Sequence, residues 1–207
     1  MAAVAHVASG SHVDALTAVM TTAFRDDPVW GEYSFPDSHE RPERPAAFWR
    51  FYLEAMLRLR WTFITPGGEA AAVWMPPGEP ELTDAPERGM TRVLEQLLGE
   101  RRSRVVLDVF ERLDRAHPHH EPHHYLSLLG THTDHRGRGL GMALLDRCLE
   151  LVDGDGSPAY LESTNPANDA RYASRGFEPY GSVELAGGQV VTTMWRPARP
   201  RAAQPPP

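Results

Sequence analysis

Three glycines and two arginines stand together in the stretch from Arg136 to Gly141, which reads RGRGLG. A short apolar run, Tyr125 to Leu129, precedes it and indicates a buried strand, and apolar residues at helical spacing follow it from Met142. The first turn of a helix presents unpaired N–H groups and a partial positive charge, and glycines let a ligand approach the backbone. Because successive amides suit phosphate oxygens, the stretch predicts a pyrophosphate site. The alternative is a ligand-free turn, which three glycines disfavour because they lower helix stability.

Two common kinds of pyrophosphate loop do not fit this stretch. A P-loop needs Gly-Lys-Ser/Thr after its glycines, and the chain contains no lysine. The dinucleotide fingerprint Gly-x-Gly-x-x-Gly requires a glycine where this chain has Met142, counting from Gly137, or Leu144, counting from Gly139. A different class of phosphate-bearing ligand is therefore expected.

The remaining pattern is R-x-x-G-x-G, formed by Arg136, Gly139 and Gly141. It resembles the coenzyme A pyrophosphate loop of the GNAT superfamily, the acetyl-CoA-dependent N-acetyltransferases. The segment LLGTHTDHRGRGLGMALL resembles that family's fourth strand, loop and third helix, and residues 159–181 resemble its fifth strand, fourth helix and the start of the next strand. The resemblance covers residues 125–195. The layout of the whole chain resembles, more loosely, the puromycin N-acetyltransferase branch, which makes puromycin one candidate amine.

This resemblance implies an α/β GNAT fold, with a mixed central sheet that is splayed at the acetyl-CoA site and helices on both faces. We expect a single GNAT domain over residues 1–196 and a disordered, proline-rich tail over 197–207. Apolar stripes predict helices over 13–24, 48–59, 90–98 and 105–113, and a strand hairpin over 61–64 and 70–75.

The resemblance also implies which residues contact acetyl-CoA. The strand end would pair its backbone with the pantetheine arm, the loop amides would hold the pyrophosphate, and two asparagines would bond the pantetheine amides. The asparagines have an alternative role as caps of the helix that follows them. The expected cofactor-binding residues are Leu129, Gly130, Thr131, Arg136, Gly137, Arg138, Gly139, Leu140, Gly141, Met142, Asn165, Asn168 and Tyr172.

Acetyl transfer requires an acid for the departing thiolate and a base for the amine proton. Tyr172 lies seven residues after Asn165, where the superfamily places the tyrosine that protonates the thiolate. The alternative for Tyr172 is an aromatic ring packed between helix and sheet. The base stays open, because many relatives carry a glutamate in the central strand and Tyr125 to Leu129 contains none. The candidates are His124, Glu162 acting through water, and Asp26 or Asp27 from a long loop.

That long loop, residues 25–45, also holds the candidate substrate-binding residues Asp27, Trp30 and Tyr33. Its aromatic side chains either line a substrate pocket or pack the loop against the core. The histidine-rich run from His117 to His124 matches no structural zinc spacing, so we expect a loop there and no metal. The resemblance leaves either His123 or His124 as a candidate to face the active site. The single cysteine, Cys148, falls on the apolar face of a helix and is expected in the core.

Composition limits the partners. A formal net charge of −7 argues against a general nucleic-acid-binding surface, and no apolar run reaches membrane-spanning length. We expect no signal peptide and a cytoplasmic location. The expected partners are acetyl-CoA and a small-molecule amine, either an antibiotic, which would confer resistance, or an amino-acid-like metabolite. The alternatives are a protein N-terminal or peptide acetyltransferase and a non-catalytic acyl-CoA-binding sensor. The sequence leaves monomer and dimer equally open.

Overall fold

The structure is a computed structural model that describes residues 5–82 and 84–199. Seven strands form one sheet in the order β1-β2-β3-β4-β5-β7-β6. Neighbouring strands are antiparallel, except that β4 and β5 are parallel. This confirms the mixed central sheet. The strands are β1 (His6–Val7), β2 (Thr62–Ile64), β3 (Ala70–Met75), β4 (His124–Thr131), β5 (Ala159–Ser163), β6 (Glu178–Glu184) and β7 (Val190–Arg196).

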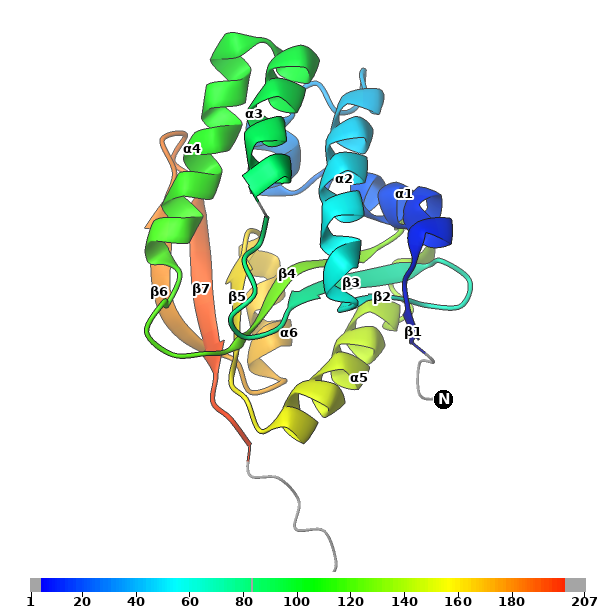
Figure 1. Cartoon of the computed structure of the whole chain (residues 1–207), viewed down its shortest axis with the longest axis vertical. Coiled ribbons are helices and arrows are strands. Elements are labelled where there is room, and N and C mark those ends of the chain that lie inside the picture. Colours follow the sequence, from blue (N-terminus) through cyan, green and yellow to red (C-terminus); the bar gives the residue numbers. More distant parts are fainter. Residues whose placement is uncertain (1–4, 83, 200–207) are drawn as a thin grey trace, which may run out of the picture.

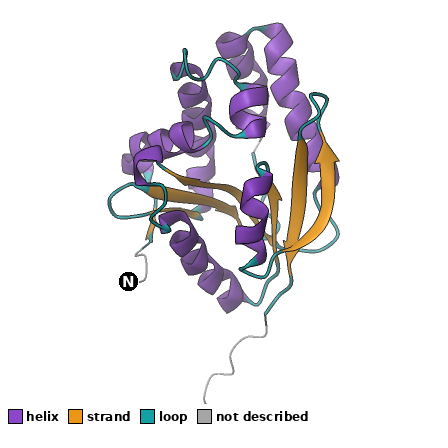
Figure 2. Cartoon of the chain, turned by 180° about the vertical axis from the view of Figure 1, so that it is seen from behind, coloured by secondary structure: helices purple, strands orange, loops and turns teal. Residues whose placement is uncertain are grey.

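Helices cover both faces of the sheet (Figures 1 and 2). One face packs against α1 (Val13–Ala23), α2 (Glu43–Met56), α3 (Asp84–Leu98) and α4 (Glu100–Ala116). The other face packs against α5 (Leu140–Asp155) and, through Tyr172, against α6 (Asp169–Ala173). Among residues 5–82 and 84–199, no helix is both long and apolar enough to cross a membrane.

Strand β3 shows why the core has two parts. All six of its residues are buried. Ala71, Val73 and Met75 belong to the core beneath α1 and α2, whereas Ala70, Ala72 and Trp74 belong to the core beneath α5. Successive side chains of a strand point to opposite faces, so a strand covered on both sides must be apolar at every position.

Helix α5 brings its apolar stripe to the second core, as its spacing predicts. Leu144, Leu145, Cys148, Leu149 and Val152 are all buried there. Burial raises the pKa of the Cys148 thiol to about 12. A thiol that stays protonated and buried is a core residue rather than a nucleophile.

Strands β4 and β5 separate after a short paired stretch. They pair only from His124 to Leu126 and from Ala159 to Leu161. Beyond this point β4 continues to Thr131 alongside β3 alone. A β-bulge begins the separation: Val73 pairs with Leu128 and Trp74 with Leu126, so Ser127 is the extra residue. The prediction of a splayed sheet is confirmed.

The segment after α1 differs from the expected plain loop. Residues Pro28–Ser34 form a turn of π-helix. The Asp27 carboxylate caps this turn by accepting hydrogen bonds from the N–H groups of Val29, at 3.0 Å, and Trp30, at 2.9 Å. These capping hydrogen bonds order the start of a segment that the sequence predicted to be a loop. At the other end of the chain, residues 200–207 of the predicted tail lie outside the described residues.

Candidate active site

The glycine-rich stretch forms the N-terminus of α5. Gly137 and Gly139 have φ angles of 77° and 73°, in the left-handed region that side chains other than glycine avoid. Within the part of the chain that the structure describes, the backbone N–H groups of residues 137–142 have no hydrogen-bond acceptor. Six successive donors therefore lie at the positive end of a 16-residue helix. This arrangement fits the pyrophosphate of coenzyme A.

The two arginines of the stretch have different surroundings. The Arg136 guanidinium donates hydrogen bonds to the carbonyl oxygens of Thr22, at 3.4 Å, and Ala23, at 2.7 Å. These carbonyls close the last turn of α1, so Arg136 fastens the loop to α1. Arg138 is exposed, and its guanidinium lies 3.0 Å from Nδ1 of His135.

Leu129, Gly130 and Thr131 lie on β4 beyond its separation from β5. The edge of these residues that faces β5 has no strand partner among the described residues, and their pairing with a pantetheine arm stays a prediction. A Cβ on Gly130 would lie 2.9 Å from Cβ of Ala23 and 3.1 Å from Sδ of Met20. Glycine is required there because α1 approaches the strand so closely.

Asn165 and Asn168 both make local hydrogen bonds. The Asn165 side-chain oxygen accepts from the N–H of Ala167 at 3.0 Å and caps a short 3₁₀ turn. The Asn168 side-chain oxygen accepts from the Arg171 guanidinium at 2.9 Å. These contacts show the capping role for Asn165, and the predicted role of both residues toward coenzyme A stays a prediction.

Tyr172 is half-buried on α6 and packs edge-on against Phe177, with ring centroids 6.2 Å apart. Burial, reinforced by the negative charge of Asp27, raises its pKa to about 12. The phenol is therefore protonated at neutral pH, as a proton donor must be.

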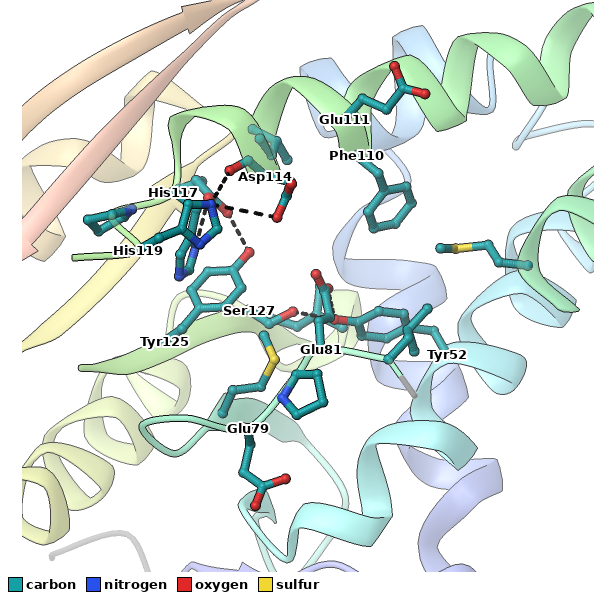
Figure 3. A pocket seen from close by; sticks show the side chains of 18 of the residues that line it. Tyr52, Glu79, Glu81, Phe110, Glu111, Asp114, His117, His119, Tyr125 and Ser127 are labelled. Atoms are coloured by element: carbon teal, nitrogen blue, oxygen red, sulfur yellow. Dashed lines mark hydrogen bonds and ion pairs between the residues drawn. The ribbon is translucent and has the colours of Figure 1, made fainter. Parts of the chain in front are cut away.

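A cavity of about 830 Å³ opens where β4 and β5 separate, on the sheet face that carries α2 and α4. Figure 3 shows Tyr125 and His117 on one side of it, Tyr52 on the other, and Glu81 and Ser127 between them. Its polar lining comes from several elements: Tyr52, Glu79, Glu81, Thr91, Glu111, Asp114, His117, His119, Glu121, His123, Tyr125, Ser127, Glu162 and Thr164.

Two carboxyl groups in this cavity are each held by a tyrosine. The Tyr125 hydroxyl donates to Glu162, whose side chain is only 4% exposed. The Tyr52 hydroxyl donates to Glu81 and lies 2.6 Å from Oγ of Ser127 at the bulge. The structure thus places Glu162, predicted as a candidate base, in the cavity and adds Glu81 beside it.

His124 is not brought to this cavity. Its Nε2 lies 3.1 Å from the carboxylate of Asp155 at the end of α5, and its ring packs on Trp61. Alternation along β4 turns His124 to the α5 face and Tyr125 to the cavity. His124 as candidate base is therefore corrected, and of the two histidines left open by the sequence, His123 is the one that lines the cavity.

The three candidate substrate residues of the loop, Asp27, Trp30 and Tyr33, lie in different environments. Trp30 lines the cavity. Asp27 is buried and accepts a further hydrogen bond from Oγ1 of Thr164 at 2.8 Å, so its carboxylate is occupied by the cap and by β5's end. Tyr33 packs against the core and against Gly187 rather than lining the cavity. Asp26 pairs on the surface with His39 at 3.0 Å.

Sequence reasoning missed Glu81, Tyr52 and His117. Tyr52 falls on the buried stripe of α2 and His117 in a run interpreted as a loop. Glu81 lies in the proline-rich break after β3, where no periodicity indicates which way a side chain points. The available signal was the pair of acidic residues, Glu79 and Glu81, that closely follows a fully buried strand.

Glu81→Gln is expected to stabilise the protein at pH 8 and to change its stability little at pH 5. Burial raises the pKa of Glu81 to about 7. The folded state then binds a proton more tightly than the unfolded state, so stability falls as pH rises from the unfolded pKa through 7. Glutamine removes this loss, about 3 kcal/mol at pH 8, and still accepts the Tyr52 hydrogen bond. Urea unfolding at pH 5 and pH 8 measures the free energy of unfolding of the variant and of the wild type. The control is Glu79→Gln, because Glu79 is half-exposed beside Arg58, and it should change stability little at either pH.

Known proteins support this arrangement. The model of the acetyltransferase (GNAT) family matches residues 108–177, which include the glycine loop and Tyr172. A structure described as histone acetyltransferase HPA2 and related acetyltransferase from Corynebacterium glutamicum is 22% identical, with a TM-score of 0.70 over 99% of both chains. An agmatine N-acetyltransferase is 19% identical, with a TM-score of 0.62 over 94% of this chain and 99% of its own. The NatC complex bound to Gag peptide and coenzyme A contains a chain that is 13% identical, with a TM-score of 0.54 over 96% of this chain and 100% of its own.

At these identities the solved structures show a shared fold and not a shared acceptor. Their described acceptors or partners include a histone, a small amine and a peptide. The segment that matches the family model contains the free N–H groups of residues 137–142 and the point where β4 separates from β5. Residues 108–177 therefore match the acetyltransferase (GNAT) family, and the chain as a whole shares the fold of solved acetyltransferases.

Proposed function

We propose that this protein transfers an acetyl group from acetyl-CoA to a primary amine of a small molecule, by direct attack in a ternary complex. The observation that carries the proposal is the cavity with two tyrosine-held carboxyl groups at the point where β4 leaves β5. The N–H groups of residues 137–142, which would bind the pyrophosphate, lie between the end of β4 and the first turn of α5.

The lining of the cavity favours a cationic acceptor. Six acidic side chains contribute to it, and arginine contributes none among the described residues. An ammonium ion entering such a site is attracted by these charges, whereas an acidic metabolite is repelled. The apolar remainder of the lining, which includes Trp30, Met75 and Phe110, suits the carbon body of the amine.

The residues then have distinct roles. Amides of residues 137–142 hold the pyrophosphate, and the free edge of β4 near Gly130 pairs with the pantetheine arm. Glu162 receives the amine proton, directly or through a water molecule, and Tyr172 gives a proton to the departing thiolate. Acetyl-CoA supplies the acetyl group as a thioester.

Tyr172→Phe is expected to lower kcat by about 10- to 100-fold and to leave the affinity for acetyl-CoA within about twofold. Phenylalanine keeps the ring that packs on Phe177 and removes the proton donor. Steady-state kinetics with a calorimetric titration of acetyl-CoA separates the two effects. An unchanged kcat would remove Tyr172 as the acid and leave it as a packing residue.

Release of coenzyme A across an amine panel tests the function itself. The panel contains aminonucleosides with puromycin first, aminoglycosides, amino acids, polyamines and short peptides. A small amine with saturable turnover supports the proposal. Turnover with peptides alone would instead indicate a peptide acetyltransferase. Tight binding of acetyl-CoA with no turnover would indicate an acyl-CoA sensor.

A further inference from the structure

The histidine-rich segment before β4 forms an ordered chain of contacts that ends at Glu162. Nε2 of His117 lies 3.0 Å from Nε2 of His123, and Nδ1 of His123 lies 2.6 Å from the carbonyl oxygen of Glu121. On its other side, Nδ1 of His117 lies 3.8 Å from Oε1 of Glu162. Two imidazoles thus connect a buried carboxylate with the loop at the cavity mouth.

The carbonyl of Glu121 determines where the protons of this chain lie. A carbonyl oxygen only accepts hydrogen bonds, so Nδ1 of His123 carries its proton. Burial lowers the pKa of His123, so the neutral ring has a lone pair on Nε2. His117 must then donate from its own Nε2. Neutral His117 is left with a lone pair on Nδ1, the atom that faces Glu162.

Nδ1 of His117 and the carboxylate of Glu162 are both acceptors, and 3.8 Å is too long for a direct hydrogen bond. A proton on Nδ1 turns this pair into an imidazolium beside a carboxylate. His117 also caps the C-terminus of the 17-residue helix α4, where the helix dipole favours a cation. Its side chain is 20% exposed and that of Glu162 is 4% exposed, so His117 is the more accessible of the two groups.

The other ionisable groups around this ring are mostly acidic or neutral. Tyr125 and Tyr160 contact its edges from β4 and β5, with ring centroids 4.9 and 4.8 Å away. His119 is the third imidazole, 5.4 Å away. Glu81 and Asp114 line the same cavity.

We propose that His117 accepts the proton released in acetyl transfer, and that His123 is a positioning residue that holds His117 in the accepting tautomer. This inference rests on the proposed acetyl transfer. The acceptor enters as R–NH₃⁺ and loses one proton to Glu162, which passes it to Nδ1 of His117 through a bridging water molecule, because the two groups are 3.8 Å apart. The amine nitrogen then forms the bond to the acetyl carbon, and the C–S bond breaks with its electron pair on sulfur. Tyr172 protonates the thiolate and regains a proton from the new amide nitrogen. The balance is R–NH₃⁺ and acetyl-CoA giving R–NH–COCH₃, coenzyme A and one proton, which leaves through His117.

Kinetics of His117→Ala tests the acceptor. We expect kcat at pH 7 to fall by about 10- to 100-fold, acetyl-CoA affinity to be unchanged, and added imidazole to restore part of the rate. Unchanged kcat with active wild type would overturn the proton path alone. Wild type that turns over no amine would overturn acetyl transfer and the path with it.

A matched pair of variants tests the positioning role. His123→Gln offers a side-chain carbonyl to Nε2–H of His117 and is expected to retain most activity, whereas His123→Leu offers no acceptor and is expected to lose about tenfold in kcat with a shifted pH profile. Equal kcat and equal pH profiles of the two variants would overturn the positioning role of His123. Long-range ¹⁵N NMR of the free protein gives a readout besides activity: His117 should carry its proton on Nε2 and His123 on Nδ1. The opposite tautomers would overturn the inference.

Discussion

Gly139→Glu is expected to abolish acetyl-CoA binding and to leave the chain folded. The backbone of Gly139 is at a φ of 73° and begins α5, and a Cβ built there meets no atom within 4 Å. The added carboxylate would stand at the row of free amides and repel the pyrophosphate, a like-charge contact that costs several kcal/mol and hence at least about 100-fold in affinity. Calorimetric titration of acetyl-CoA measures it.

Gly156→Glu is the matched control for this variant. Gly156 ends the same helix with a φ of 67° and equally open surroundings. The backbone strain and the added charge are therefore the same at the two ends, while only one end carries the free amides. Retained affinity in Gly139→Glu, or equal loss in both variants, would contradict the assignment of the loop.

Glu162→Gln is expected to lower kcat by about 100- to 1,000-fold with amines of high pKa. Glutamine keeps an oxygen for the Tyr125 hydroxyl, so the packing stays intact, but the amide takes up no proton. Amines of low pKa enter already neutral and should lose much less. The dependence of the rate loss on amine pKa measures the base role separately from binding.

The control is Glu178→Gln, an exposed carboxylate on β6. It should leave turnover unchanged. If Glu162→Gln kept full activity while Glu81→Gln lost it, the base would be Glu81, whose raised pKa near 7 also suits proton transfer at neutral pH.

The predicted elements agree with the structure where the prediction rests on the periodicity of apolar residues along one face. The stripe that starts at Val13 became α1, the hairpin became β2 and β3, and the apolar spacing after Met142 became α5. Such patterns are local, because burial of one face requires a fixed period. Helices α2 and α4 begin before their predicted apolar stripes, at Glu43 and Glu100, because the first turns of a surface helix carry polar residues.

The candidate site was predictable only in part. The loop from Arg136 to Gly141 is contiguous in sequence, so its chemistry is visible in six letters. The cavity is assembled from residues as distant as Tyr52 and Glu162, and no local pattern connects them. His123 and His124 show the limit most clearly: the sequence left both open, and successive side chains at a strand point to opposite faces, so only the structure decides which one lines the cavity.

The sequence by itself predicted the fold class and the candidate acid Tyr172 through its resemblance to a known family, and it predicted a pyrophosphate loop from its glycines, because these motifs are short contiguous segments. Only the tertiary structure decided which carboxylates meet in the cavity, that Asp27 serves as a cap, and that His117 rather than His124 stands beside Glu162. The physical reason is that the bulge at Ser127 and the separation of β4 from β5 set which side chains face one another, and both depend on strand pairing between distant parts of the chain.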